Sequence, residues 1–187
     1  IEMDEKRFFI RRFITDNSKA RIIVFVRTRV RAERVSKALE RGDIKSATIH
    51  GEKDQKDRTD VMDRFKSGEM NILIATDVSA RGIDIADVNY VINYDLPEKS
   101  ENYVHRVGRT GRGIKKGIAI SFCSPEEKER LDAIQGFLNK KIEMIPISKK
   151  EHKDTIALTN ETDNIQDLIM EQEEWEKKKR TKRKKKK

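Results

Sequence analysis

The sequence predicts an α/β fold in which helices cover both faces of a central, mostly parallel sheet. Short runs rich in isoleucine and valine recur along the chain and are mostly continuous, as in strands buried on both faces. Stretches with the periodicity of amphipathic helices separate these runs, and such alternation is typical of parallel sheets. The predicted strands are Ile22 to Val26, Ala47 to His50, Ile72 to Ala75, Tyr90 to Tyr94 and Ile118 to Phe122.

Start and stop signals define three helices most clearly. The first has Asp54 as its cap and Gly68 as its stop signal. Its inner face is formed by Arg58, Val61, Met62 and Phe65. A second helix begins at Ser100 and runs to about Gly108, and a third begins at Pro125.

Polar residues follow four of the predicted strands. Ligands of parallel sheets bind beyond the carboxyl ends of the strands, so we expect a ligand at this edge. The residues at these ends are Arg27 and Thr28, His50 and Gly51, Thr76 and Asp77, and Asn93 and Asp95.

Length and composition indicate one domain with an extension. A chain of 187 residues is long enough to bury one sizeable core. We expect a domain over residues 1–147, a linker with room for a short helix over 148–176, and a disordered polybasic tail over 177–187. Residues 149–163 are polar, whereas Ile165, Leu168, Ile169 and Trp175 form one narrow apolar stripe. The start at Ile1, directly in a helix-like pattern, suggests a fragment of a longer protein.

The positive charge of the chain comes from its tail. The whole sequence has 42 Lys and Arg against 33 Asp and Glu, a formal net charge of +9. Ten of the basic residues lie in Lys177 to Lys187, and the rest of the chain has a net charge of −1. Anion binding by the domain must therefore depend on local placement. RNA binding, localisation and solubility all remain open as roles of the tail.

The cellular setting is constrained by what the sequence lacks. The single cysteine, Cys123, excludes an intramolecular disulfide and favours a reducing, intracellular and cytoplasmic location. The longest apolar run, Ile22 to Val26, is far too short to span a membrane, so we expect no membrane association. No pattern of ligands predicts a metal site in this chain.

The stretch HRVGRTGR, from His105 to Arg112, predicts half of a nucleotide site. Its arginines repel one another unless an anion lies between them, and guanidinium groups suit phosphate oxygens. No glycine is followed by lysine, so the chain has no phosphate-binding loop, and no paired acids follow a strand to hold magnesium. An isolated cluster of this kind would more simply complement the negative end of a helix dipole. The glycine spacing and the other motifs favour the nucleotide.

Five stretches in order resemble the motifs of the second RecA-like domain of DEAD-box RNA helicases. They cover about residues 20 to 145, and HRVGRTGR fits the family pattern at every fixed position. The resemblance implies a RecA-like three-layer fold and an ATP-dependent RNA helicase whose first domain carries the phosphate loop and the DEAD acids. The other stretches are FVRT (25–28), HGEKDQKDR (50–58), ATDVSARGIDI (75–85) and VINYDLP (91–97).

The resemblance also implies roles toward ATP. Arg109 and Arg112 would be the arginine fingers that reach the γ-phosphate when the two domains close. Asp84 would accept a hydrogen bond from the ribose, beside Gly82, although a loop cap is the simpler interpretation of Asp84 alone. Arg81 and His105 would couple to the first domain, which would hold most of the ATP and its magnesium. Arg106 receives no role.

A second group of residues is expected to bind RNA. Arg58 begins the inner face of its helix at the first turn, where a helix amino terminus also attracts phosphate. A solvated or packed arginine is an equal alternative without the resemblance. The expected contacts are Thr28, Arg29, Gly51, Arg58 and Thr76. Hydroxyl, guanidinium and backbone groups contact phosphate and ribose, so binding should be largely independent of RNA sequence.

Two other functions compete with this interpretation. The first is a stand-alone module that binds RNA or protein without an ATP cycle. The second is a DNA helicase of a related branch, against which the RGID element and the Q-x-x-R spacing of Gln55 to Arg58 argue. In the favoured interpretation the chain alone is inactive as an ATPase.

Overall fold

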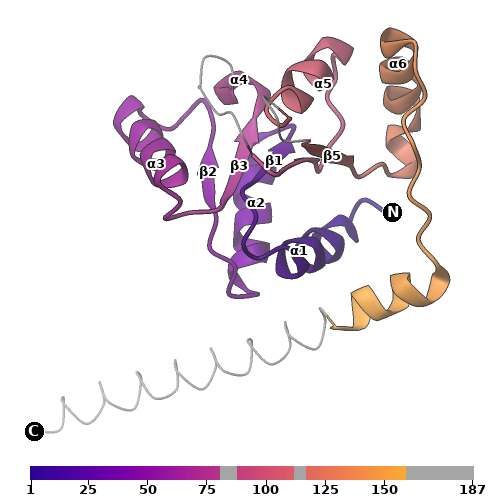
Figure 1. Ribbon diagram of the computed structural model, residues 1–187, viewed down its shortest axis with the longest axis horizontal. Helices are drawn as coiled ribbons and strands as arrows, with labels where there is room; N and C mark the ends of the chain where they lie inside the picture. Colours follow the sequence, from indigo (N-terminus) through magenta and orange to yellow (C-terminus); the bar gives the residue numbers. More distant parts are fainter. Residues whose placement is uncertain (81–87, 112–116, 159–187) are drawn as a thin grey trace, which may run out of the picture. The chain divides into compact units, whose positions relative to one another are not determined.

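The computed structural model describes residues 1–80, 88–111 and 117–158. Contacts divide the chain into two units, Ile1–Pro146 and Ile147–Lys187. The first unit contains the strands β1 (Ile22–Val26), β2 (Ala47–Ile49), β3 (Ile72–Thr76), β4 (Tyr90–Asn93) and β5 (Ile118–Ser121). Its helices are α1 (Lys6–Asp16), α2 (Arg29–Glu40), α3 (Gln55–Ser67), α4 (Asp77–Ala80), α5 (Ser100–Val107), the short 3₁₀ helix η1 (Pro125–Glu127) and α6 (Lys128–Leu138) (Figure 1). None of the described helices is long and apolar enough to cross a membrane.

The predicted parallel sheet is confirmed. The strand order is β2-β3-β1-β4-β5, and every neighbouring pair is parallel. The strands coincide with the five apolar runs of the sequence, with ends that differ from the predicted ones by about one residue. Strand β1 lies in the centre and is buried along its whole length, which explains its uninterrupted apolar sequence.

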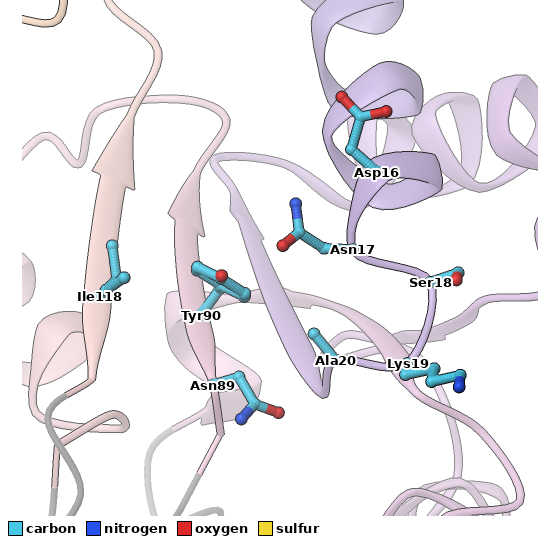
Figure 2. Close-up of a pocket in the computed structure, with 8 residues that line it drawn as sticks. All are labelled: Asp16, Asn17, Ser18, Lys19, Ala20, Asn89, Tyr90 and Ile118. Carbon is cyan, nitrogen blue, oxygen red and sulfur yellow. The ribbon is translucent and has the colours of Figure 1, made fainter.

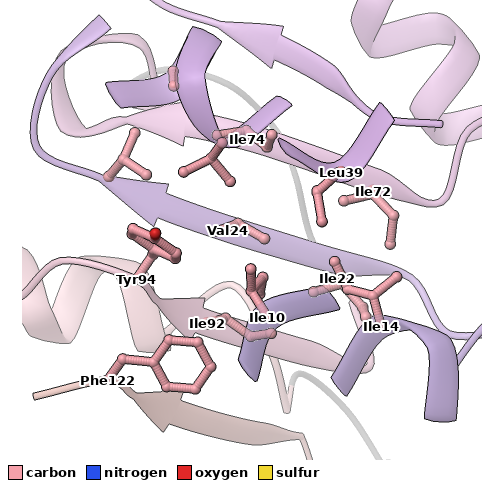
Figure 3. Close-up of a cluster of buried hydrophobic side chains, with 13 residues drawn as sticks. Ile10, Ile14, Ile22, Val24, Leu39, Ile72, Ile74, Ile92, Tyr94 and Phe122 are labelled. Carbon is pink, nitrogen blue, oxygen red and sulfur yellow. The ribbon is translucent and has the colours of Figure 1, made fainter. Parts of the chain in front are cut away.

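Two apolar layers enclose the sheet. On one face, Ile10 and Ile14 of α1 pack with Ile22 and Val24 of β1, and α2 contributes Leu39 (Figure 3). On the other face α3 covers the sheet, and its inward side chains are Val61, Met62 and Phe65. Alternate residues of β1 belong to the two layers, because successive side chains of a strand point to opposite faces.

Both ends of α3 follow the predicted signals. The side chain of Asp54 accepts a hydrogen bond from the backbone N–H of Asp57 at 2.8 Å, which satisfies one of the free donors of the first turn. Gly68 ends the helix in the left-handed region, with φ of 80°. The caps fix where α3 begins and therefore fix the position of Arg58 in its first turn.

A buried ion pair ties α1 to the beginning of the last helix. Nζ of Lys6 donates to Glu127 of η1 and to the backbone carbonyl of Tyr94, and both charged side chains are fully buried. Glu127 also accepts from the backbone N–H of Leu96 at 3.1 Å. Burial lowers the pKa of Lys6, although the hydrogen bond to Glu127 and its charge oppose that effect. The pair holds the two ends of the first unit together.

In the second unit, residues 149–158 are helical, within the interval 148–176 where a linker with room for a short helix is expected. The hydroxyl of Ser148 accepts from the backbone N–H of Glu151 at 3.1 Å, and the Glu151 carboxylate accepts from the backbone N–H of Ser148 at 2.9 Å. This capping box was present in the sequence and starts a helix despite the polar composition. The apolar stripe from Ile165 to Trp175 and the polybasic tail lie outside the described residues.

Two glycines in helical surroundings should respond oppositely to the same substitution. Neither has an atom within 4 Å of an added Cβ, but Gly68 has a positive φ and Gly136 lies within α6. We expect Gly68→Ala to lower the free energy of unfolding by about 1–2 kcal/mol and Gly136→Ala to raise it by about 0.5–1 kcal/mol. Urea denaturation of the two variants beside the original chain measures both shifts. Equal signs would contradict the assignment of Gly68 as the left-handed end of α3.

Candidate functional site

The parallel register brings three of the predicted RNA contacts to one edge of the sheet. Val26 is the neighbour of Thr76 and Ile49 is the neighbour of Ala75, so the chain leaves β1, β2 and β3 at the same carboxyl edge. Thr28, Gly51 and Thr76 follow or end these strands. Thr28 and Gly51 are exposed, whereas Thr76 is only 6% exposed. A side chain at Gly51 would make only ordinary contact with Val78, at 4.0 Å.

Thr28 and Arg29 start α2. The Thr28 hydroxyl accepts from the backbone N–H of Arg31 at 3.2 Å, and a hydroxyl that accepts in this way can still donate. Arg29 forms an ion pair with Glu52, which follows Gly51. Both of these charged side chains are more than half exposed, so their pairing contributes little and can be exchanged for another anion.

Arg58 lies half-buried in the first turn of α3. Its Nε is buried and has no hydrogen-bond partner in the described part of the chain. A buried donor without a partner is costly, and one on a guanidinium group favours an anionic oxygen. The Nε of Arg58 is therefore available to an anionic oxygen beside the first turn of α3.

One polar group of this edge was missed by the sequence analysis. The Glu33 carboxylate of α2 accepts from Thr48 at 2.7 Å and pairs with Nε2 of His50 at 3.0 Å, so it fixes the end of β2 next to Gly51. Burial alone would raise the pKa of Glu33, but the hydrogen bonds from Thr48 and His50 outweigh it and lower the pKa. No motif in the sequence links Glu33 to the strand that it contacts.

Arg106 is a buried structural arginine rather than one member of a repelling cluster. Its side chain is 1% exposed. Nε and Nη2 donate to the two carboxylate oxygens of Asp77 at 2.6 and 2.9 Å. Nη1 donates to Asn93 at 3.1 Å and to the backbone carbonyl of Asp95 at 2.7 Å, and the guanidinium lies over the ring of Phe25. Arg106, for which the sequence analysis assigns no role, therefore has its charge compensated within the domain.

Asp95 extends this network across the sheet. It is completely buried, and its carboxylate accepts from the backbone N–H of Arg27 at 3.0 Å and pairs with Arg31 at 3.2 Å. Its backbone carbonyl accepts from Arg106. One residue thus connects the end of β1, helix α2 and helix α5.

The turn after α5 carries Arg109. The helix ends at Val107, one residue before the predicted end, and the N–H of Arg109 donates to the carbonyl of Arg106 at 3.1 Å. Arg109 is half-buried, and His105 in the last turn of α5 is exposed. The Thr110 hydroxyl donates to the carbonyl of Val88 at 2.6 Å, just before β4 begins. The turn therefore lies at the amino end of β4, away from Thr28, Gly51 and Thr76.

Gly111 and Gly117 allow this turn to close. Gly111 has a φ of 71°, a left-handed backbone conformation that glycine adopts without strain. A Cβ at Gly117 would meet the Thr110 side chain and the Gly111 backbone well inside contact distance, so only glycine fits. Four predicted site residues, Arg81, Gly82, Asp84 and Arg112, lie outside the described residues.

An open hollow of about 500 Å³ lies at the amino ends of β4 and β5, near the turn after α5, whose Thr110 hydroxyl is 3.4 Å from the carbonyl of Asn89. Figure 2 shows its lining: Asn17 and Ala20 come from the segment after α1, and Tyr90 and Ile118 begin β4 and β5. None of the predicted site residues lines it. The candidate site is therefore not this hollow but the carboxyl edge of the sheet together with the turn after α5.

Comparison with known proteins identifies the class to which this fold and site belong. The helicase conserved C-terminal domain family matches residues 5–113, which include every described residue of the candidate site. The ATP-dependent RNA helicase FAL1 of Mycosarcoma maydis is 40% identical over 129 residues, which are 69% of this chain and 32% of that protein. The chain thus spans about a third of the length of this curated relative.

Solved structures narrow the class further. The DEAD-box protein SrmB of E. coli, bound to the regulator of ribonuclease activity A, has a TM-score of 0.74 and 34% identity over 78% of this chain and 86% of that chain. Dbp5 of S. cerevisiae, bound to RNA and ADP BeF3, has a TM-score of 0.72 and 30% identity over 86% of this chain and 43% of that chain. This chain belongs to the helicase C-terminal domain family and is the C-terminal, RecA-like domain of a DEAD-box RNA helicase.

The contacts of Glu33 predict a specific dependence on pH. Its pKa in the folded chain is below the ordinary 4.5, so the ionised form adds stability above that value, and this contribution is lost as the pH falls through the folded pKa. We expect Glu33→Gln to lower the free energy of unfolding at pH 7 by less than about 1 kcal/mol, because the carboxylate is about half exposed. The difference from the original chain should shrink as the pH falls to about 4.

Urea denaturation at several pH values measures this difference. Glu40→Gln is the matched control, since Glu40 is an exposed carboxylate of the same helix whose side chain has no partner in the described part of the chain. A Glu33→Gln difference that is independent of pH would contradict the assignment.

Proposed function

We propose that the full-length protein is an ATP-dependent RNA helicase and that this chain supplies its arginine fingers and part of its RNA groove. The observation that carries the proposal is that one sheet positions two separate groups suited to anions. Thr28, Gly51 and Thr76 lie at the carboxyl edge, and Arg109 lies in the turn at the amino end of β4. Two separate groups of this kind are expected in a protein that binds two phosphate-containing ligands, RNA and ATP.

The carboxyl edge would bind RNA through its backbone. Thr28 offers a hydroxyl proton, Gly51 offers an exposed backbone without a side chain, and Arg58 has a buried Nε without a partner. Arg29 can exchange Glu52 for a phosphate because their ion pair is exposed. Thr76 is buried, so it would contribute through the backbone at the strand end. These groups recognise phosphate and sugar, which supports binding that is independent of base sequence.

The turn after α5 would act on ATP. Arg109 and Arg112 would stabilise the charge that develops on the γ-phosphate, and Asp84 and Gly82 would contact the ribose. Arg81 and His105 would meet the first domain. Nucleotide fits this end because a half-buried guanidinium lies on a turn held rigidly by Thr110, Gly111 and Gly117. ATP with magnesium, held mainly by the first domain, would supply the phosphoryl group.

The structure of Dbp5 supports assigning both ligands to one protein, since that relative was solved with RNA and ADP BeF3. A stand-alone module that binds RNA without an ATP cycle is the competing function. The sequence upstream of residue 1 separates the two, because a helicase requires a phosphate loop and a D-E-A-D element there. This chain alone should show no ATP hydrolysis in either case.

The arginine fingers are tested in the full-length protein. Arg109→Ala or Arg112→Ala should lower RNA-stimulated ATP turnover about a thousandfold or more. Circular dichroism and thermal unfolding of each variant, compared with those of the original protein, show whether the fold is retained. Turnover within a few-fold of the original in either variant would remove that arginine from the proposed role.

Arg58 is tested by RNA affinity. Arg58→Ala should weaken binding of a single-stranded RNA about tenfold, as expected for loss of one charge-assisted phosphate contact. The slope of log affinity against log salt should also decrease in magnitude by about 0.7. Arg64→Ala is the matched control, since Arg64 lies on the same helix, is 41% exposed and pairs with Glu69. Equal effects of the two substitutions would make Arg58 a non-specific or structural residue.

A further inference from the structure

The two groups of residues in the proposed function lie at opposite ends of the strands, yet one residue close to the turn after α5 reaches the carboxyl edge with its side chain. Arg106 lies in the last turn of α5, three residues before Arg109. Its guanidinium reaches Asp77, which directly follows Thr76 at the carboxyl edge. No other described side chain of α5 makes an ion pair with the end of β3.

The contact between Arg106 and Asp77 is rigid. Two parallel hydrogen bonds, at 2.6 and 2.9 Å, fix the guanidinium in the plane of the carboxylate. Asn102, one helical turn earlier in α5, donates a further hydrogen bond to the same carboxylate at 3.3 Å. Nη1 also donates to Asn93 and to the backbone carbonyl of Asp95. Each nitrogen of the guanidinium therefore donates to a residue at or just after the end of β3 or β4.

Burial makes this contact difficult to break. A guanidinium that is 1% exposed would be left as an uncompensated buried charge if it lost its carboxylate. Arg29 with Glu52 is the opposite case, because both charges are exposed. When the end of β3 shifts, α5 must therefore shift with it, whereas Arg29 can change partners freely.

The backbone continues the connection to Arg109. The carbonyl of Arg106 accepts the N–H of Arg109 at 3.1 Å, and the carbonyl of Val107 accepts the N–H of Thr110 at 3.1 Å. The turn is anchored in addition by Thr110 on Val88. A displacement of Arg106 is thus transmitted to Arg109 through hydrogen bonds that span only three residues.

We propose that Arg106 is a positioning residue that couples the RNA edge, through Asp77, to the arginine finger Arg109. Contact of RNA with Thr76 and its neighbours sets the position of Asp77. Asp77 sets the orientation of α5, and α5 sets the direction of Arg109. The inference rests on the proposed function, since it assumes RNA at one end and ATP at the other.

Two conservative substitutions in the full-length protein test the coupling. Arg106→Lys keeps the charge but cannot make the paired hydrogen bonds to Asp77, and Asp77→Asn keeps the shape but removes the charge. In both we expect RNA-stimulated kcat to fall at least about tenfold, while the RNA concentration for half-maximal stimulation changes less than about threefold. Both variants should lower kcat while changing the RNA concentration for half-maximal stimulation far less. The test therefore remains valid if one of them folds poorly.

Hydrogen exchange gives a readout that does not depend on turnover. In the original protein, a single-stranded RNA should slow exchange of the α5 amides, and in Arg106→Lys the same RNA should leave their exchange unchanged. If Arg106 has a merely structural role, the substitution should speed α5 exchange equally with and without RNA. That second result would overturn the proposal.

Ile14→Ala is the control for general destabilisation, since Ile14 packs in the apolar layer between α1 and the sheet and takes no part in the hydrogen bonds of Arg106 and Asp77. Its stimulated kcat should stay within about twofold of the original, and an equal loss there would attribute the effect to general destabilisation and overturn the coupling. An original protein without RNA-stimulated hydrolysis would overturn the proposed function and the coupling together. Full stimulation in Arg106→Lys and Asp77→Asn would overturn the coupling alone.

Discussion

The arrangement of the carboxyl edge depends on buried charges that satisfy one another. Asp95 accepts from Arg27, Arg31 and, through its carbonyl, Arg106, and Arg106 in turn holds Asp77. Removing one partner would leave another charge buried without compensation, which is far more costly than the pair is worth. The network therefore acts less as a source of stability than as a constraint on geometry. It fixes where α2, α4 and α5 leave the sheet, and the proposed RNA contacts Thr28, Arg29 and Thr76 lie at the first two of those points.

The same constraint is compatible with the proposal that one small domain serves two ligands at opposite ends. The apolar layers under α1, α2 and α3 make the sheet a rigid plate, while the exposed contacts at its edge, such as Arg29 with Glu52, remain exchangeable. Buried pairs keep the geometry fixed, and exposed pairs can exchange partners. The proposed function would need both kinds of contact, because RNA would have to bind and leave while the proposed arginine finger keeps one direction. Ion pairs of similar composition thus differ in burial, and this difference decides which of them keep the geometry fixed and which can exchange partners.

Sequence patterns predict most of this fold, since strands buried on both faces and capped helices leave local signals. Strand β1 is recognised in the sequence from the apolar run Ile22 to Val26, and helix α3 from its end signals, Asp54 and Gly68, for that reason. Arg106 is different: its partner Asp77 lies 29 residues earlier, and no local pattern distinguishes a paired arginine from one that awaits a ligand. Glu33 was missed for the same reason, because it contacts Thr48 and His50 only after α2 packs on the sheet. The start of the helix after Ser148 was not located, although its capping box is local, because the polar composition outweighed it.

The ion pair between Lys6 and Glu127 joins residues 121 positions apart. During synthesis, α1 emerges from the ribosome long before the residue that neutralises its buried lysine. Until Glu127 is available, placing Lys6 in the interior would leave an uncompensated charge there, so the complete docking of α1 must wait for nearly the whole domain. The first helix in the sequence is therefore among the last to reach its final position, and its apolar face stays accessible to chaperones in the meantime.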